Sequence, residues 1–247
     1  MQGGTMGGRG SSSTGVTGRG ISRGRMLVEG IMADPDKTDR QKNKELIGLL
    51  KTEAGFSDVK GFTNYETESL AAITEALVDL EETYGAIRAT KGDGAPTPKL
   101  SSTNAQGYHG KVGGFMIGGK PHLNMFLRRD THVNADENAR IHKAEQDRGE
   151  KSRTDGSRKA LLQSTVVHEY GHLLHYAISD SKMVTTGNMR SRISSLAGTT
   201  EPPSRYAGSS ASEYFAESFL SYRLGGSNMH AAGKGMGEYL KELGYGS

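Results

Sequence analysis

The segment "TVVHEYGHLLHY", from Thr165 to Tyr176, holds three histidines and one glutamate within an otherwise apolar run. Apolar residues flank the polar ones, so we expect a buried helix from about Ser157 to Ile178. Gly171 costs about 1 kcal/mol relative to alanine inside a helix, which predicts a close neighbour at that position. Buried imidazoles and carboxylates need hydrogen-bond partners or a metal ion, so these polar residues require one of the two.

The spacing of the polar residues is that of a zinc site. His168 and His172 stand four residues apart, so on a helix both imidazoles project from one face and can bind a single tetrahedral metal ion. Glu169 is rotated by about 100° and lies beside that ion, where its carboxylate can take a proton from water and pass it to a leaving amine. The H-E-x-x-H pattern therefore predicts two ligands and a general base. Hydrogen-bonded core histidines are the alternative.

A catalytic zinc site needs a third protein ligand. Ile178 stands where metzincins have a third histidine, and we expect His175 only in a supporting or partly exposed position. Glu213 and Glu217, in "SEYFAESF", lie four residues apart on one helical face among aromatic side chains, where an unpaired carboxylate is costly. We therefore expect Glu213 as third ligand and Glu217 as the acceptor that orients a ligating histidine. An ordinary exposed acidic pair is the alternative.

The combination of H-E-x-x-H with "EYFAESF" about 45 residues later resembles the gluzincin metallopeptidases. The similarity is greatest to the anthrax lethal factor-like group, which includes toxins and proline-proline endopeptidases, and it covers Thr165 to Arg223. The resemblance implies a zincin-like fold with one catalytic Zn²⁺ and Glu169 as general base. The ligands that it implies are His168, His172 and Glu213. It also implies that Tyr206 stabilises the oxyanion, a role worth about 10² to 10³ in rate.

The composition excludes several other classes of protein. The chain has 247 residues, enough for one sizeable domain with a tail or for two small domains. It has no cysteine, which excludes disulfides, thiolate catalysis and cysteine-based zinc sites. The net charge is +3 with acids and bases interspersed, so we expect no nucleic-acid binding. We expect no signal peptide and no membrane segment, and hence a soluble protein that is cytoplasmic, virion-associated or delivered by a non-classical route.

Most of the chain is predicted to form one domain. Residues 1–33, rich in Gly, Ser and Arg, are expected to be a flexible leader. Whether this leader joins the chain to a larger assembly is left open. Residues 34–247 are expected to form an α+β zincin-like domain, helical over 34–95 and with the metal-binding core in 96–247. Besides the metal helix, the pattern predicts helices over about Asp36–Gly55 and Asn64–Tyr84, from Ser210, and near the C-terminus.

The remaining segments predict strands and loops. "GGFMIGGKPHLNMFLRR", starting at Gly113, predicts two strands of a small mixed or antiparallel sheet. By the family resemblance, "GGFMIGG" or "HLNMFLR" is expected to be an edge strand that pairs with substrate. The phosphate-loop spacing from Gly114 to Lys120 is rejected, because Pro121 stands where a hydroxyl is required. The charged segment Asp130–Lys159 is predicted to be a long exposed loop with some helix, and a loop is predicted between the metal helix and Ser210.

These features predict a zinc-dependent endopeptidase that acts on peptide or protein substrates and has no membrane partner. The alternative is a virion-associated or toxin-delivery structural protein that carries a zincin scaffold with incidental or lost activity, as the Gly-rich leader suggests. Glu169 argues against this alternative, because degenerate zincins often lose that glutamate. Zinc hydrolysis of a non-peptide amide would use the same residues and stays open.

Overall fold

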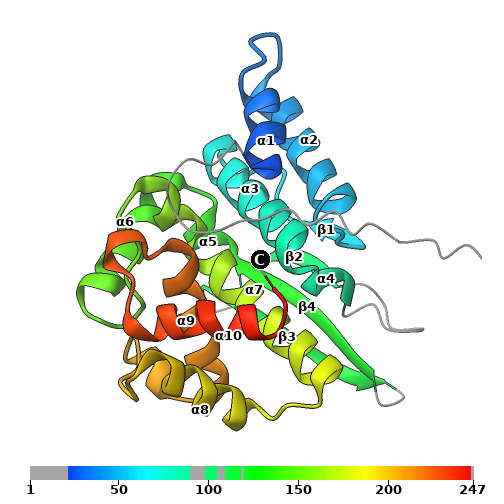
Figure 1. Ribbon diagram of the computed structural model, residues 1–247. Helices are drawn as coiled ribbons and strands as arrows, with labels where there is room; N and C mark the ends of the chain where they lie inside the picture. The colour runs from blue at the N-terminus through cyan, green and yellow to red at the C-terminus, as the bar shows by residue number, and fades with distance from the viewer. Residues whose placement is uncertain (1–21, 90–97, 105–108, 118–119, 246–247) are drawn as a thin grey trace, which may run out of the picture.

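The computed structural model describes residues 22–89, 98–104, 109–117 and 120–245. Within these residues, helices predominate over one small mixed sheet, and the fold class is α+β as predicted. The N-terminal helices α1 (Arg23–Met32), α2 (Asp39–Thr52) and α3 (Thr67–Tyr84) gather at one end of the molecule (Figure 1). No helix in the described part of the chain has the length and apolar character needed to span a membrane.

The helix α1 corrects the prediction of a flexible leader over residues 1–33. Ser22 caps this helix by accepting a hydrogen bond from the backbone N–H of Arg25. Val28 and Ile31 are buried where α1 packs on α3, and this apolar face is what orders residues 23–32. Residues 1–21 lie outside the described residues. The helix α3 was predicted, but its N-cap is Glu66 rather than Asn64.

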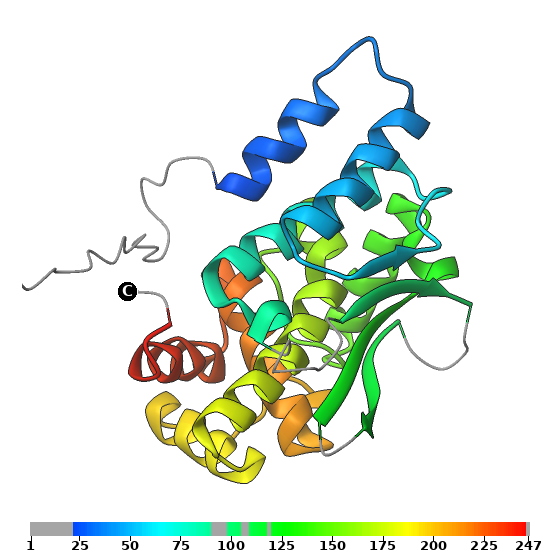
Figure 2. The same ribbon diagram turned by 90° about the vertical axis from the view of Figure 1, so that its right-hand side faces the viewer.

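The four strands lie together along one side of the helical body (Figure 2). They are β1 (Asp58–Lys60), β2 (Lys99–Thr103), β3 (Gly110–Ile117) and β4 (Lys120–Arg128), in the order β1-β2-β4-β3. The β1–β2 and β2–β4 pairs are parallel, whereas β3 and β4 are antiparallel. The predicted strand pair is thus confirmed. "GGFMIGG" contributes to the edge strand β3, but "HLNMFLR" lies in β4, which has neighbours on both sides and cannot pair with another chain.

Two predicted loops contain helices. The charged segment after Asp130 forms α5 (Arg129–His132) and α6 (Ala135–Asp147), and the prediction of a long exposed loop is wrong because α6 buries a polar face. The residues on that face include Asn138, His142, Glu145 and Gln146. Before Ser210, α8 (Thr186–Ala197) is capped by Thr185 and packs Met189 and Ile193 into the core.

The central element is α7 (Arg158–Lys182), which carries the H-E-x-x-H residues. It begins at the N-cap Ser157 and contacts α3, α6, β3 and α9 (Ala211–Leu224). Ser210 caps α9 by accepting a hydrogen bond from the backbone N–H of Glu213. The short elements α4 (Ala86–Ala89), η1 (Tyr206–Gly208) and η2 (Gly226–Asn228) and the last helix α10 (Ala231–Glu242) complete the fold. As predicted, α7 and α9 are helices, and their packing sets the geometry of the site.

Candidate metal centre

The packing of α7 on α9 brings the predicted ligands together. A Cβ added at Gly171 would lie 3.0 Å from the Cα of Ala216, so the two helices approach closely at this glycine. The Nε2 atoms of His168 and His172 lie 3.2 and 3.3 Å from the same oxygen, Oε2 of Glu213. Two histidines of one helix and a carboxylate of the next therefore converge on one point.

The geometry of this cluster fits a tetrahedral metal ion. Ligand atoms that are each 2.0–2.1 Å from a tetrahedral zinc ion lie about 3.3 Å from one another, close to the two distances measured to Glu213. Apart from these two histidine contacts, the buried Oε2 atom of Glu213 has no hydrogen-bond partner among the described residues, so a cation would satisfy it. Within the described residues, His168, His172 and Glu213 form the one group of three whose ligand atoms lie within 4.8 Å of one another.

The outer nitrogens of both histidines have partners. Nδ1 of His168 lies 2.7 Å from Oε1 of Glu217, and Nδ1 of His172 lies 3.1 Å from the hydroxyl of Ser212. Glu217 is fully buried, and its other oxygen accepts hydrogen bonds from the backbone N–H of Ser152 (2.6 Å) and the hydroxyl of Ser204 (2.9 Å). The placement of Glu217 beside His168 is that expected of a residue that orients a metal ligand.

The charges of the cluster favour a cation at its centre. Burial and the charge of Lys151 lower the pKa of His168, but Glu213 and Glu217 outweigh both and raise it to about 9. Burial raises the pKa of Glu217, yet its contact with His168 dominates and lowers it to about 2. Metal binding must displace the proton from His168, so it is expected to release protons.

Glu169 lies beside the cluster, against the start of the edge strand. Its carboxylate is buried, and Oε2 has no hydrogen-bond partner among the described residues. A Cβ added at Gly110 would lie 2.7 Å from both Cγ and Oε1 of Glu169 and 2.5 Å from Cγ2 of Thr165. The absence of a side chain at Gly110 is thus what lets β3 pass alongside the proposed base.

Tyr206 faces the same site from η1. Its ring lies 5.8 Å from the ring of His168, and 45% of the residue is exposed. Burial of the phenol and the nearby Glu213 and Glu169 carboxylates raise the pKa of Tyr206 to about 12. The phenol therefore keeps its proton at neutral pH and can donate a hydrogen bond to an oxyanion.

A cavity of about 630 Å³ opens in front of these residues. Its walls include His168, Glu169 and Tyr206 as well as residues that the motif does not contain. The additional lining residues are His109, Gly110, Arg128, Glu145, Glu150, Lys151, Arg205 and Ser209. The volume is in the range of small-molecule and peptide sites.

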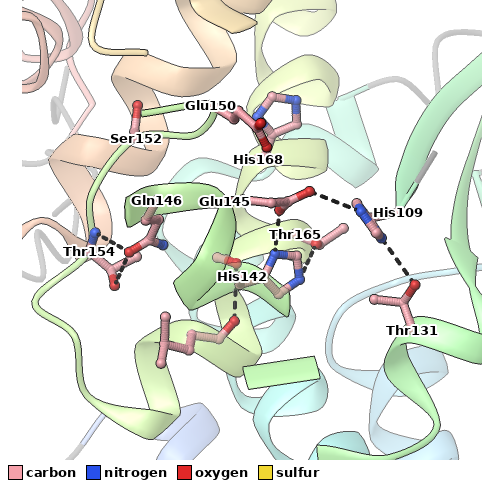
Figure 3. Close-up of polar contacts among 12 residues, drawn as sticks. His109, Thr131, His142, Glu145, Gln146, Glu150, Ser152, Thr154, Thr165 and His168 are labelled. Atoms are coloured by element: carbon pink, nitrogen blue, oxygen red, sulfur yellow. Dashed lines mark hydrogen bonds and ion pairs between the residues drawn. The ribbon is translucent and has the colours of Figure 1, made fainter. Parts of the chain in front are cut away.

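One wall of this cavity is a hydrogen-bonded histidine cluster (Figure 3). The carboxylate of Glu145 lies between His109 Nε2, at 2.9 Å, and His142 Nδ1, at 3.1 Å. His142 Nε2 lies 2.9 Å from the hydroxyl of Thr165, one turn before His168 on α7, and His109 Nδ1 lies 3.0 Å from the hydroxyl of Thr131. This hydrogen-bonded cluster was not predicted from the sequence, although His142 and Glu145 stand three residues apart, as neighbours on one face of a helix do.

His175 is placed differently from the other predicted residues. It is buried, its Nε2 lies 3.0 Å from the hydroxyl of Thr186 on α8, and its ring packs against Phe215. The ring thus connects α7 to α8 and lies away from the ligand atoms. Burial lowers the pKa of His175 to about 4, so it is neutral at physiological pH.

Comparisons with known proteins found no similarity to report. No family model matches the chain, and no curated protein and no solved structure matches it significantly.

Proposed function

We propose that this chain is a zinc-dependent endopeptidase of the gluzincin type, with a zincin-like fold. The observation that carries the proposal is the convergence of His168, His172 and Glu213 beside a buried carboxylate, Glu169, with His168 and Glu169 lining a cavity. The edge strand β3, which starts beside Glu169, supports a peptide substrate, because an edge strand can pair with an extended chain.

The mechanism that we propose assigns a role to each residue. A bound zinc ion would supply Lewis acidity and lower the pKa of a coordinated water. Glu169 takes the proton of the attacking water and transfers it to the nitrogen of the leaving amine. Tyr206 donates a hydrogen bond to the carbonyl oxygen as negative charge develops there. Glu217 and Ser212 orient the two ligating imidazoles.

The experiment is incubation of the zinc-loaded protein with a proteome-derived peptide library, followed by identification of new termini by mass spectrometry. The matched control is Glu169→Gln, which keeps the volume of the side chain and removes its basicity. We expect new termini from the wild type alone, with equal zinc content in both proteins. Equal cleavage by the variant would refute the assigned base.

A library left intact by both zinc-loaded proteins would refute the endopeptidase. It would favour the alternative of a structural or binding protein that carries the same scaffold. Absence of stoichiometric zinc from the wild type would refute the metal centre itself.

A further inference from the structure

The cavity beside the metal centre is lined by both acidic and basic side chains, and some of them are already paired. The guanidinium of Arg128 makes two contacts with Asp130, at 2.6 and 2.7 Å. The carboxylate of Glu150 lies 2.7 Å from the guanidinium of Arg148. Paired groups of this kind have little net charge to offer a ligand.

On the acidic wall of the cavity, both oxygens of the Glu145 carboxylate already have partners. Glu145 lies within 3.1 Å of a nitrogen of both His109 and His142 (Figure 3). These contacts outweigh the effect of burial and hold the pKa of Glu145 well below its usual value. Its carboxylate is thus ionised, and a substrate group would have to displace an imidazole to bind it.

Two cations of the cavity have no carboxylate of the described residues within ion-pair distance. No residue in the described ranges forms an ion pair with Lys151 or Arg205. The ammonium of Lys151 lies 5.4 Å from the centre of the Tyr206 ring. Lys151 is half-buried, so its charge is less screened than that of a surface lysine.

Backbone hydrogen bonds join the segment that carries Lys151 to the segment that carries Arg205 and Tyr206. The N–H of Arg205 donates to the carbonyl of Gly149 at 2.9 Å, and the N–H of Tyr206 donates to the carbonyl of Glu150 at 3.3 Å. Ser152 anchors the first of these segments, because its N–H and its hydroxyl donate to the side chain and the backbone carbonyl of Glu217. The backbone positions of the two cations are therefore fixed relative to each other, which lowers the entropic cost of binding an anion.

We propose that Lys151 and Arg205 bind a carboxylate of the peptide next to the scissile bond, an inference that rests on the proposed endopeptidase function. Arginine supplies a planar fork that matches a carboxylate, and lysine supplies a point charge. Preferred substrates therefore carry an aspartate or glutamate, or a free terminal carboxylate, close to the cleaved bond. The two cations set specificity, whereas Glu169 and Tyr206 act on the reacting atoms.

The test compares peptides that differ only in charge at one position. Each cleaved sequence is made with Asp or Asn, Glu or Gln, and a free or an amidated C-terminus. For the wild type we expect kcat/KM to be about 10-fold or more higher for the acid than for its amide. Lys151→Met and Arg205→Met should each remove most of this ratio, and they should do so through KM. Arg140→Met removes one charge from an exposed position that does not line the cavity, and it should keep the ratio.

Other outcomes are distinguishable. If kcat/KM is higher only for peptides with an internal Asp or Glu, the bound group is a side-chain carboxylate. If it is higher only for peptides with a free C-terminus, the bound group is the terminal carboxylate. Equal kcat/KM for acid and amide peptides overturns the inference but leaves the endopeptidase intact. An equal loss of kcat for all peptides in Lys151→Met also overturns it, because Lys151 would then act on the oxyanion. If no peptide is cleaved, the dissociation constants of acid and amide peptides for zinc-loaded Glu169→Gln decide the question, and equal values refute the carboxylate site.

Discussion

The carboxylate of Glu217 lies 2.7 Å from Nδ1 of His168, whose Nε2 is directed at Glu213. The same carboxylate accepts hydrogen bonds from Ser152 and Ser204, on the segments before α7 and before Tyr206. One buried acid therefore couples a proposed metal ligand to the segments that carry Lys151 and Tyr206. Substitution of Glu217 is therefore expected to change both the zinc affinity and the positions of the cavity segments that carry Lys151 and Tyr206.

Glu217→Gln is expected to weaken zinc binding by about 10- to 100-fold. An amide has a single acceptor oxygen, so it cannot accept hydrogen bonds from His168 and from both serines at once. Its NH₂ group would face another hydrogen-bond donor, and the fully buried position offers no water to relieve this contact. Competition with a chromogenic chelator at fixed pH measures the affinity. Ser212→Ala removes the hydrogen-bond partner of His172, the more exposed of the two ligating histidines, and should lower the zinc affinity by a smaller factor. Wild-type affinity in Glu217→Gln would contradict the orienting role.

Gly110→Ala is expected to reduce turnover about 100-fold while zinc remains bound. The added Cβ would overlap Thr165 and Glu169, and the flexible carboxylate of Glu169 is the group that can move. A shift of about 1 Å in a proton-transfer group can cost this much. Steady-state kinetics and zinc content measure the two effects.

The double variant provides the control for Gly110→Ala. If the glycine acts only through the position of Glu169, adding Gly110→Ala to Glu169→Gln should lower the residual rate no further. Additive losses would show that the strand β3 contributes in another way, for example by pairing with substrate.

The helices that hold the proposed ligands were predictable because their signals are local. In α7 and α9 the apolar residues recur at helical spacing and a serine N-cap stands at each start, Ser157 and Ser210. The proximity of Glu217 to His168 could be expected from the four-residue spacing to Glu213. In contrast, some helix was expected between Asp130 and Lys159, but the burial of α6 was not predicted because its buried face is polar, and β1 was missed because it has only three residues.

The rest of the cavity depends on contacts between distant segments. His109, the residue before β3, meets Glu145 of α6, and Arg205 meets Gly149 through a backbone bond that has no sequence signature. Which charged side chains of the cavity form ion pairs also cannot be predicted from the sequence. Lys151 is one of many basic residues along the chain, and only the fold shows that no carboxylate of the described residues lies within ion-pair distance of it.

Gly171→Ala is expected to destabilise the fold by about 1–2 kcal/mol and to weaken zinc binding. Its Cβ would lie 3.0 Å from the backbone of Ala216 and 3.3 Å from the ring of Phe219, so α7 and α9 would have to separate. Glu213 would then move away from the two histidines. Urea unfolding of the apoprotein and a zinc titration measure the two effects.

Gly48→Ala is the matched control for this substitution. Gly48 lies within α2, and an added Cβ there would meet no atom within 4 Å. The helix should gain about 0.5–1 kcal/mol in this variant, since alanine loses less backbone entropy than glycine. Stabilisation of Gly171→Ala by a similar amount would show that the two helices do not constrain each other at this point.

The fold is expected to lose stability below about pH 6.5, in part through His132. This side chain is buried beside His142, and Nε2 donates a hydrogen bond to the carbonyl of His109 at 2.9 Å. Burial, and then the proximity of His142, lower the pKa of His132 to about 3, against about 6.5 in the unfolded chain. Between these two pH values the unfolded chain binds the proton and the folded chain does not, so the free energy of unfolding falls as the pH falls.

His132→Gln isolates this contribution, because an amide can still donate to the carbonyl of His109 but does not titrate. From pH 6.5 to 4.5 the wild type should lose about 1–2 kcal/mol more than the variant, since each pH unit is worth at most about 1.4 kcal/mol per proton. The measurement is urea unfolding at several pH values with a chelator present, so that protonation of His168 is the same in both proteins. Parallel stability curves for the two proteins would show that His132 is protonated in the fold or neutral in both states.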